Sequence, residues 1–156
     1  PLIDSAAADR VESWITEAIE AGAAKLCGGE RSANTISPTL LEGVPSDCKL
    51  ARQEVFGPVA YMVRVGTLDE AIRTVNLSRY GLQAGIYSEN EDEIERAFRY
   101  LEVGALIVGD VPTFRTDPMP YGGVKDSGTG REGPLYAAEH MTELRLLARR
   151  DREGKA

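Results

Sequence analysis

The sequence predicts an α/β fold in which a largely parallel sheet carries helices on its faces, in three layers. Segments with helical periodicity alternate with short apolar runs over residues 58–108, in the order strand, helix, strand, helix, strand. The runs 82–87 and 105–108 are mostly apolar, as expected for strands that are covered on both sides. The 156 residues, 42% hydrophobic and 28% charged, are enough to form one folded domain.

Three segments have the periodicity of amphipathic helices, and each carries a start signal. The first begins after Asp4 or Ser5 and is expected to stop at Gly22. The second begins at Thr67 with a capping-box pattern, and the third begins near Asn90 and ends by Gly104. Their apolar stripes are Val11, Trp14, Ile15, Ala18 and Ile19; then Leu68, Ala71, Ile72 and Val75; then Ile94, Ala97, Phe98 and Leu101.

The chain changes character after Gly109. Residues 110–133 hold three prolines and five glycines with almost no periodicity, which predicts one long functional loop. A short helix at 135–140 and a final strand at 141–148 follow. We therefore divide the chain into a main domain at 1–140, a terminal strand at 141–148 and a charged tail at 149–156.

Composition excludes several classes of partner. The formal net charge of −7 argues against a nucleic-acid surface, and no apolar run approaches the roughly 18 residues that span a membrane. No signal peptide is visible, and the two cysteines make no disulfide framework, so a cytoplasmic location is expected. The single histidine, His140, has no partner at metal-binding spacing, and we expect no metal site.

The stretch 53–59 is the most informative for function. Glu54 and Phe56 are two residues apart, so they lie on the same side of the chain if it is extended. A carboxylate that accepts two hydroxyl hydrogens, beside a ring that covers a flat face, suits a ligand with a vicinal diol and a flat ring. On spacing alone, a solvated glutamate and a core phenylalanine are the simpler interpretation.

The run 128–133 has the spacing G-x-G-x-x-G of dinucleotide-binding loops. It follows a proline- and glycine-rich loop instead of a strand, and no second strand with a terminal acidic residue comes after it. We therefore expect it to turn the chain and to pack closely against neighbouring backbone.

The motif Glu54-Val55-Phe56-Gly57-Pro58 resembles the Glu-x-Phe-Gly-Pro motif of the aldehyde dehydrogenase family. Further stretches that resemble the family in the same order lie at 1–3, 38–41, 80–85, 119–128, 130–133 and 141–143. The likeness runs along nearly the whole chain. It implies the C-terminal half of an aldehyde dehydrogenase catalytic domain within 1–140, followed by an oligomerisation strand at 141–148.

The resemblance assigns roles to five residues. It implies that Glu54 holds the nicotinamide ribose hydroxyls of NAD or NADP and that Phe56 packs near the nicotinamide. Phe114 and Tyr121 would line the aldehyde tunnel, with loop anchoring as the alternative. Because the stretch 112–115 resembles family members acting on small or phosphorylated aldehydes, Arg115 would meet an anionic group of the substrate.

The family's nucleophile motif, Gly-Gln-x-Cys, does not occur in these 156 residues. We therefore expect no catalytic residue in this chain, and we interpret Cys27 and Cys48 as structural thiols. Two positions depart from the family pattern. Gly109-Asp110 stands where Asn-Asp is usual, and Gln53 stands where the residue is often acidic.

The implied function is NAD(P)-dependent oxidation of a small-molecule aldehyde to a carboxylic acid, with the segment alone expected to be inactive. The strand at 141–148 implies a homo-oligomer, because exposed ladder groups seek a partner. The alternative is a non-catalytic assembly module that associates with itself or with full-length dehydrogenase subunits.

Overall fold

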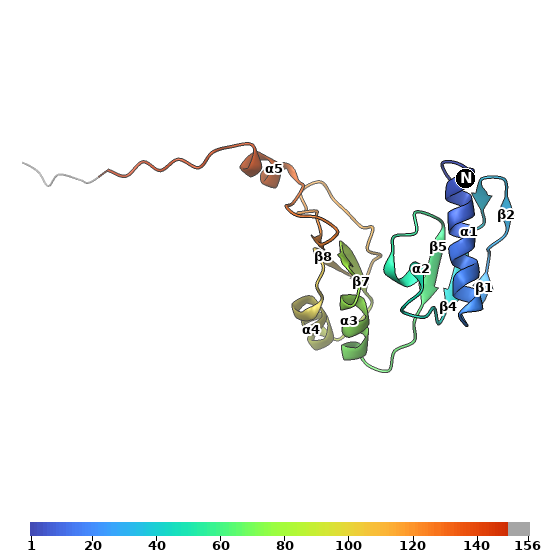
Figure 1. Ribbon diagram of the computed structural model, residues 1–156. Coiled ribbons are helices and arrows are strands. Elements are labelled where there is room, and N and C mark those ends of the chain that lie inside the picture. Colours follow the sequence, from blue (N-terminus) through green and yellow to red (C-terminus); the bar gives the residue numbers. More distant parts are fainter. Residues whose placement is uncertain (150–156) are drawn as a thin grey trace, which may run out of the picture. The chain divides into compact units, whose positions relative to one another are not determined.

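The computed structural model describes residues 1–149, which form two compact units. The N-terminal unit comprises Pro1–Arg79 together with Glu95–Leu101. The C-terminal unit comprises Tyr80–Ile94 and the described residues from Glu102 onward (Figure 1).

Helix α1 (Ser5–Glu20) opens the N-terminal unit. The Asp4 side chain caps it by accepting a hydrogen bond of 2.7 Å from the backbone N–H of Ala7, which satisfies one of the free amides of the first turn. The helix ends before Gly22, which has a φ of +107°. Its buried face consists of Ala8, Val11, Trp14, Ile15 and Ala18. Ile19, which was predicted on this stripe, is 39% exposed.

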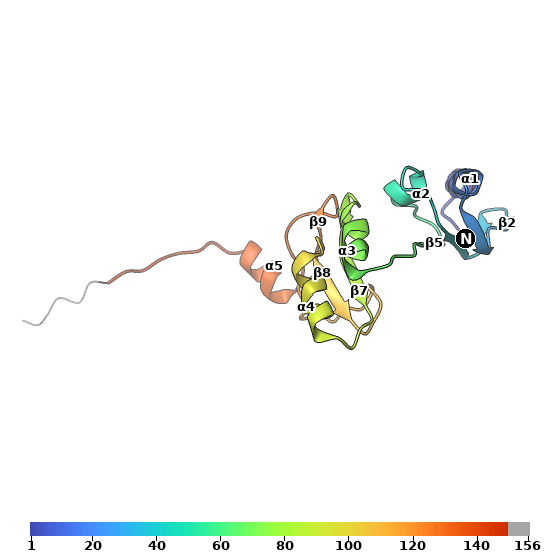
Figure 2. The same cartoon turned by 90° about the horizontal axis from the view of Figure 1, so that it is seen from below.

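A three-stranded sheet with the order β1-β4-β5 lies against this helix. Strand β1 (Ala24–Cys27) is antiparallel to β4 (Thr39–Glu42), and β4 is parallel to β5 (Val59–Met62). Figure 2 shows α1 and the short helix α2 (Lys49–Arg52) on the same side of the sheet. Their side chains meet the sheet in one core cluster, in which Leu41 of β4 is fully buried beside Trp14 and Leu50.

A short hairpin, β2 (Arg31–Ser32) with β3 (Thr35–Ile36), and two further helices follow. Helix α3 (Leu68–Asn76) begins where the Thr67 hydroxyl accepts from the Glu70 N–H, and α4 (Glu91–Tyr100) begins after Asn90. Arg96 of α4 donates two hydrogen bonds to Asp69 of α3, at 2.6 and 2.9 Å. Of the eight residues in the two predicted apolar stripes, Ile72 and Ala97 are buried and only Val75 and Phe98 are exposed, while the other four are half-buried.

The C-terminal unit contains a parallel pair, β7 (Gln83–Ile86) with β8 (Ala105–Val108). It also contains an antiparallel pair, β6 (Tyr80–Gly81) with β9 (Val124–Lys125), and the helix α5 (Pro134–His140), which follows β9 in the sequence. Gly104 does not end α4, which stops at Tyr100; its N–H is bonded instead to the carbonyls of Gly81 and Leu82.

The prediction of a single loop over 110–133 is wrong. The segment contains β9 and a backbone bridge between Tyr121 and Glu132. Two-residue strands and single bridges are too short to produce a periodic pattern, so the sequence does not display them.

The α/β fold class is confirmed. The two longest ladders, β4 with β5 and β7 with β8, each pair four residues and are parallel. Within the described residues these ladders belong to separate sheets, because no strand is hydrogen-bonded to both of them.

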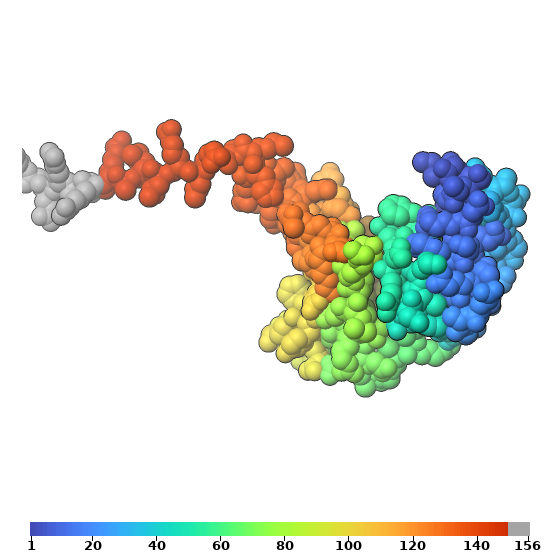
Figure 3. All heavy atoms as spheres, in the orientation of Figure 1, coloured from blue at the N-terminus to red at the C-terminus, as the bar shows by residue number. Residues whose placement is uncertain are grey.

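The described chain after α5 forms neither helix nor strand. Figure 3 shows residues 141–149 with their side chains uncovered, and Leu144 and Leu146 are 103% and 89% exposed. A strand is defined by hydrogen bonds to a neighbour, so the oligomerisation strand stays a prediction, and the charged tail beyond residue 149 lies outside the described part. No described helix is both long and apolar enough to cross a bilayer.

Candidate functional site

Glu54 and Phe56 lie in the turn between α2 and β5, which we call the 53–58 turn. Both are exposed, and 71% of Phe56 is open to solvent, so Phe56 is not a core residue of this chain. Phe56 has a φ of +44°, in the left-handed region that bulky side chains rarely occupy. The backbone is therefore not extended at Phe56, so the condition under which Glu54 and Phe56 were expected on the same side is not met there.

Helix α1 holds the backbone of this turn. The Arg10 guanidinium donates a 2.8 Å hydrogen bond from Nη1 to the Val55 carbonyl, and the Val55 side chain packs against the core clusters on α1. Gly57 lies so close to the helix that a Cβ there would be 2.9 Å from Cγ2 of Val11. The turn thus has an anchored backbone, while the Glu54 and Phe56 side chains remain accessible.

In the C-terminal unit, Arg115 and Tyr121 lie together with Glu132, and we call these three residues the Arg115 cluster. The Arg115 guanidinium carbon is 4.2 Å from the centroid of the Tyr121 ring, a cation–π contact. Nη2 of Arg115 donates to Oε2 of Glu132 at 3.1 Å. Tyr121 and Glu132 are joined by two backbone hydrogen bonds, of 3.1 and 2.6 Å. Two of the predicted substrate residues are therefore brought together.

Phe114 occupies a neighbouring turn. Its N–H donates to the Val111 carbonyl at 3.0 Å, and the residue is 42% exposed. A ring this open is available to a ligand, but exposure alone does not show what the ring contacts. The role of Phe114 in the aldehyde tunnel therefore stays a prediction.

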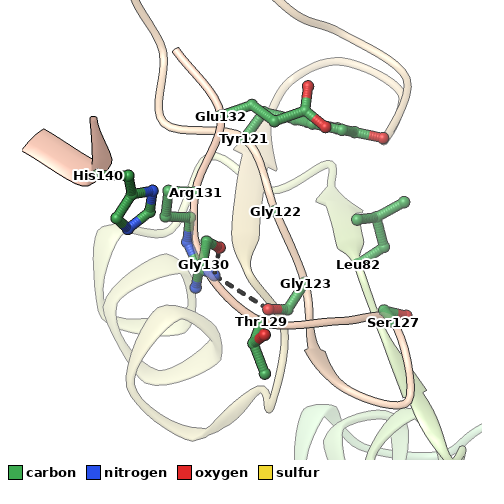
Figure 4. A pocket seen from close by; sticks show the side chains of 10 residues that line it. All are labelled: Leu82, Tyr121, Gly122, Gly123, Ser127, Thr129, Gly130, Arg131, Glu132 and His140. Atoms are coloured by element: carbon green, nitrogen blue, oxygen red, sulfur yellow. Dashed lines mark hydrogen bonds between the residues drawn. The ribbon is translucent and has the colours of Figure 1, made fainter. Parts of the chain in front are cut away.

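A hollow of about 370 Å³ opens next to the Arg115 cluster (Figure 4). Arg131 reaches across the loop there, donating from Nη1 to the carbonyls of Gly123 at 3.0 Å and Gly130 at 2.7 Å. The walls are formed by Leu82, Tyr121, Gly122, Gly123, Ser127, Thr129, Gly130, Arg131, Glu132 and His140.

The glycine-rich run at 128–133 turns the chain, as predicted, but of its three glycines only Gly133 closely faces neighbouring backbone, since a Cβ there would lie 3.1 Å from the Met119 carbonyl oxygen. Gly128, Gly130 and Gly133 all have positive φ values, of 114°, 78° and 123°. The run leads into α5, which has seven residues and follows no strand directly. Its geometry is not the strand–turn–helix arrangement of a phosphate-binding loop.

The two cysteines differ in burial. Neither cysteine is in a disulfide; Cys27 is exposed and Cys48 is buried. Burial raises the pKa of the Cys48 thiol, with smaller contributions from the charges of Asp47 and Glu17, so its nucleophilic thiolate form is disfavoured. The described residues contain no group of three His, Cys, Asp or Glu side chains able to hold a metal ion.

Two contact residues were missed from the sequence, Arg10 and Glu132. Arg10 is 45 residues from the carbonyl it binds, and Glu132 is 17 residues from Arg115. No periodic pattern connects positions so far apart, so only the fold reveals these contacts. The predicted cofactor residues lie in the N-terminal unit and the predicted substrate residues in the C-terminal unit.

The sequence profile of the aldehyde dehydrogenase family matches residues 1–147, a range that includes the 53–58 turn and the whole Arg115 cluster. The chain belongs to the aldehyde dehydrogenase family. This membership confirms the resemblance stated above and the enzyme family that it implied.

Individual aldehyde dehydrogenases match nearly the whole chain. A 3-sulfolactaldehyde dehydrogenase of Priestia megaterium is 48% identical over 147 residues, which cover 94% of this chain and 31% of that protein. A sulfoacetaldehyde dehydrogenase of Neptuniibacter caesariensis is 40% identical, with 94% of this chain and 32% of that protein covered. This chain thus spans about a third of the length of these relatives.

Solved aldehyde dehydrogenase structures share the fold. A structure of aldehyde dehydrogenase 21 from Physcomitrella patens, in complex with the reaction product succinate, has a TM-score of 0.89 at 40% identity and covers 92% of this chain and 30% of that one. A glyceraldehyde-3-phosphate dehydrogenase from Methanocaldococcus jannaschii, complexed with NADP, has a TM-score of 0.84 at 38% identity and covers 90% and 30%.

Proposed function

We propose that this chain supplies the nicotinamide-ribose clamp and part of the aldehyde channel of a longer NAD(P)-dependent aldehyde dehydrogenase. The enzyme converts an aldehyde to a carboxylic acid. The observation that carries the proposal is the 53–58 turn, in which the family motif is anchored by its backbone and open at Glu54 and Phe56.

The residues of the turn fit the nicotinamide end of a dinucleotide. The exposed Glu54 carboxylate accepts hydrogen bonds from two adjacent ribose hydroxyls, and the open face of Phe56 covers a flat ring. Bound NAD or NADP supplies the hydride acceptor for aldehyde oxidation. A structure of one related enzyme is a complex with NADP, which supports this choice of cofactor.

We further propose that the aldehyde carries an anionic group, which Arg115 binds. The Arg115 side chain is 42% exposed, and its plane is fixed by the Tyr121 ring and by Glu132. An exposed ion pair is weak in water, so a substrate anion can displace the Glu132 carboxylate at little cost. Relatives named for sulfolactaldehyde and sulfoacetaldehyde, and a related structure holding succinate, support an anionic substrate.

The function is tested with a hybrid enzyme, in which the first two-thirds or so of the Priestia megaterium relative precede this chain at Pro1. We expect the hybrid to produce NADH or NADPH from 3-sulfolactaldehyde, because the relative contributes the nucleophile and this chain contributes the ribose clamp. The 156-residue chain alone is expected to produce none, since it lacks the Gly-Gln-x-Cys motif.

Two controls accompany this assay, which follows absorbance at the wavelength of the reduced cofactor. A hybrid whose relative-derived nucleophilic cysteine is replaced by serine should be inactive. Turnover by the chain alone above a heat-killed sample would contradict the proposal, because it would place a nucleophile at Cys27 or Cys48.

We also propose that residues 141–148 form a strand with a second copy of this chain, so that the protein is a cytoplasmic homo-oligomer. Leu144, Leu146 and Leu147 are 103%, 89% and 77% exposed, which is an unfavourable exposure for apolar side chains in water. The two free thiols are consistent with a reducing compartment.

The double substitution Leu144→Glu and Leu146→Glu is expected to convert a dimeric or larger species into monomers, as measured by light scattering after size exclusion. Charged groups on a strand edge oppose pairing, and these two changes remove the apolar surface. Arg145→Glu is the matched control, because it alters the net charge by the same amount without removing a leucine. A wild-type chain that is monomeric at all concentrations tested would contradict the association.

A further inference from the structure

We propose that Arg10 is a positioning residue that holds the 53–58 turn in the conformation needed by the nicotinamide ribose. The inference rests on the proposed function of Glu54 and Phe56, and it adds a residue outside the motif. Arg10 belongs to α1, 45 residues from the carbonyl to which it donates.

The Arg10 guanidinium is fixed on two sides. Nη1 donates to the Val55 carbonyl at 2.8 Å, in a partly buried position. The guanidinium carbon is 4.9 Å from the centroid of the Trp14 ring, and Trp14 is itself 9% exposed within the core. A charged donor held against a buried ring is a stronger and more directional tether than a neutral hydrogen bond.

The hydrogen bond from Arg10 to Val55 lies between Glu54 and Phe56, the two residues of the proposed ribose clamp. Val55 separates Glu54 from Phe56, so its carbonyl orients the peptide between the two ligand-facing residues. Phe56 has a φ of +44°, and backbone in this region persists only where its surroundings hold it. Loss of the Arg10 bond therefore releases the turn toward ordinary conformations, in which the Glu54 carboxylate no longer faces the ribose.

The apolar contacts of the turn are separate from its hydrogen bond to Arg10. The apolar contacts of Val55 with the core clusters and the close packing of Gly57 on Val11 do not involve the guanidinium. Removal of the charged end thus leaves the hydrophobic attachment of the turn, while it frees the Val55 carbonyl and removes the contact with the Trp14 ring.

The first measurement is the backbone order parameter of residues 54–57 in the 156-residue chain, from NMR relaxation. Arg10→Met should lower these order parameters from about 0.85, typical of rigid backbone, toward about 0.6, typical of flexible backbone, because the Val55 carbonyl loses its tether. Arg10→Lys should restore part of the order because a lysine still donates. Arg31→Met is the matched control: Arg31 also binds α1, through Asp9 and Glu12, but does not contact the turn. Equal order parameters in Arg10→Met and wild type overturn the role of Arg10.

The second measurement is the dissociation constant of NADH or NADPH from the hybrid enzyme, followed by cofactor fluorescence. Glu54→Gln and Arg10→Met should each weaken binding about 10-fold, while Arg31→Met should not, and the KM for the aldehyde should stay unchanged in all three. If Glu54→Gln weakens binding and Arg10→Met does not, the inference is overturned and the proposed function stands. If neither weakens binding although the order parameters of residues 54–57 fall in Arg10→Met, the assignment of Glu54 and Phe56 to the ribose site itself fails.

Discussion

Replacing Leu41 with alanine is expected to lower the free energy of unfolding of the N-terminal unit by about 2–5 kcal/mol, the range for truncating a fully buried leucine. Leu41 lies in β4, the middle strand of β1-β4-β5, and has no exposed surface. It packs in the cluster that joins α1, β4 and α2, so alanine would leave a buried cavity that solvent cannot fill. Urea unfolding followed by the fluorescence of Trp14, the single tryptophan, reports on this same cluster.

The neighbouring Leu40 provides the control. It is half-buried and, being adjacent in the strand, points to the opposite face of the sheet. Leu40→Ala should cost roughly 1 kcal/mol, because less apolar area is lost. If the two substitutions prove equally costly, the cluster around Leu41 is not the principal core of this unit.

Replacing Arg115 with methionine is expected to reduce kcat/KM for 3-sulfolactaldehyde about 10- to 100-fold in the hybrid enzyme, as for loss of a hydrogen bond between charged groups. Lactaldehyde differs from this substrate only in lacking the sulfonate. Its kcat/KM should therefore change little, and the ratio between the two substrates isolates the contribution of the anion. The structural reason is the Arg115 cluster, which keeps the guanidinium over the Tyr121 ring and partly exposed.

Two further variants make this test specific. Arg99→Met removes a guanidinium from another exposed ion pair, with Glu95, and should leave the substrate ratio unchanged. Glu132→Gln removes the carboxylate that competes for Arg115 and should preserve or raise the preference for the sulfonate. An equal loss with both aldehydes in Arg115→Met would show that Arg115 supports the loop and does not recognise the anion.

Local sequence signals predicted the start of the three longest helices and the strands β5, β7 and β8, but not α2 or β4. Asp4, Thr67 and Asn90 each cap the helix that follows, because a short polar side chain satisfies a first-turn amide wherever it occurs. Prediction was poorer for burial. Ile19 and Phe98 lie on or beside apolar stripes but are 39% and 69% exposed, since a stripe shows which face is apolar and not what covers it.

For the predicted site residues too, the motif was visible in the local sequence, whereas the contacts depended on the fold. The motif around Glu54 and Phe56, and the family to which the chain belongs, are readable from residue order alone. The left-handed backbone at Phe56 was not foreseen, because it depends on the hold of α1 on the turn. Likewise, the resemblance named Arg115 and Tyr121, but not their contact or the part played by Glu132.

The sequence by itself therefore determined the α/β class, the start of the three longest helices, the family and the presence of the motif that we propose binds the cofactor. These depend on residues that are close in the chain or on their order. Only the tertiary structure decided how the motif is presented and what accompanies Arg115. A hydrogen bond from the Arg10 side chain to a backbone carbonyl 45 residues away, and one between two side chains 17 residues apart, make those arrangements, and such contacts leave no local pattern.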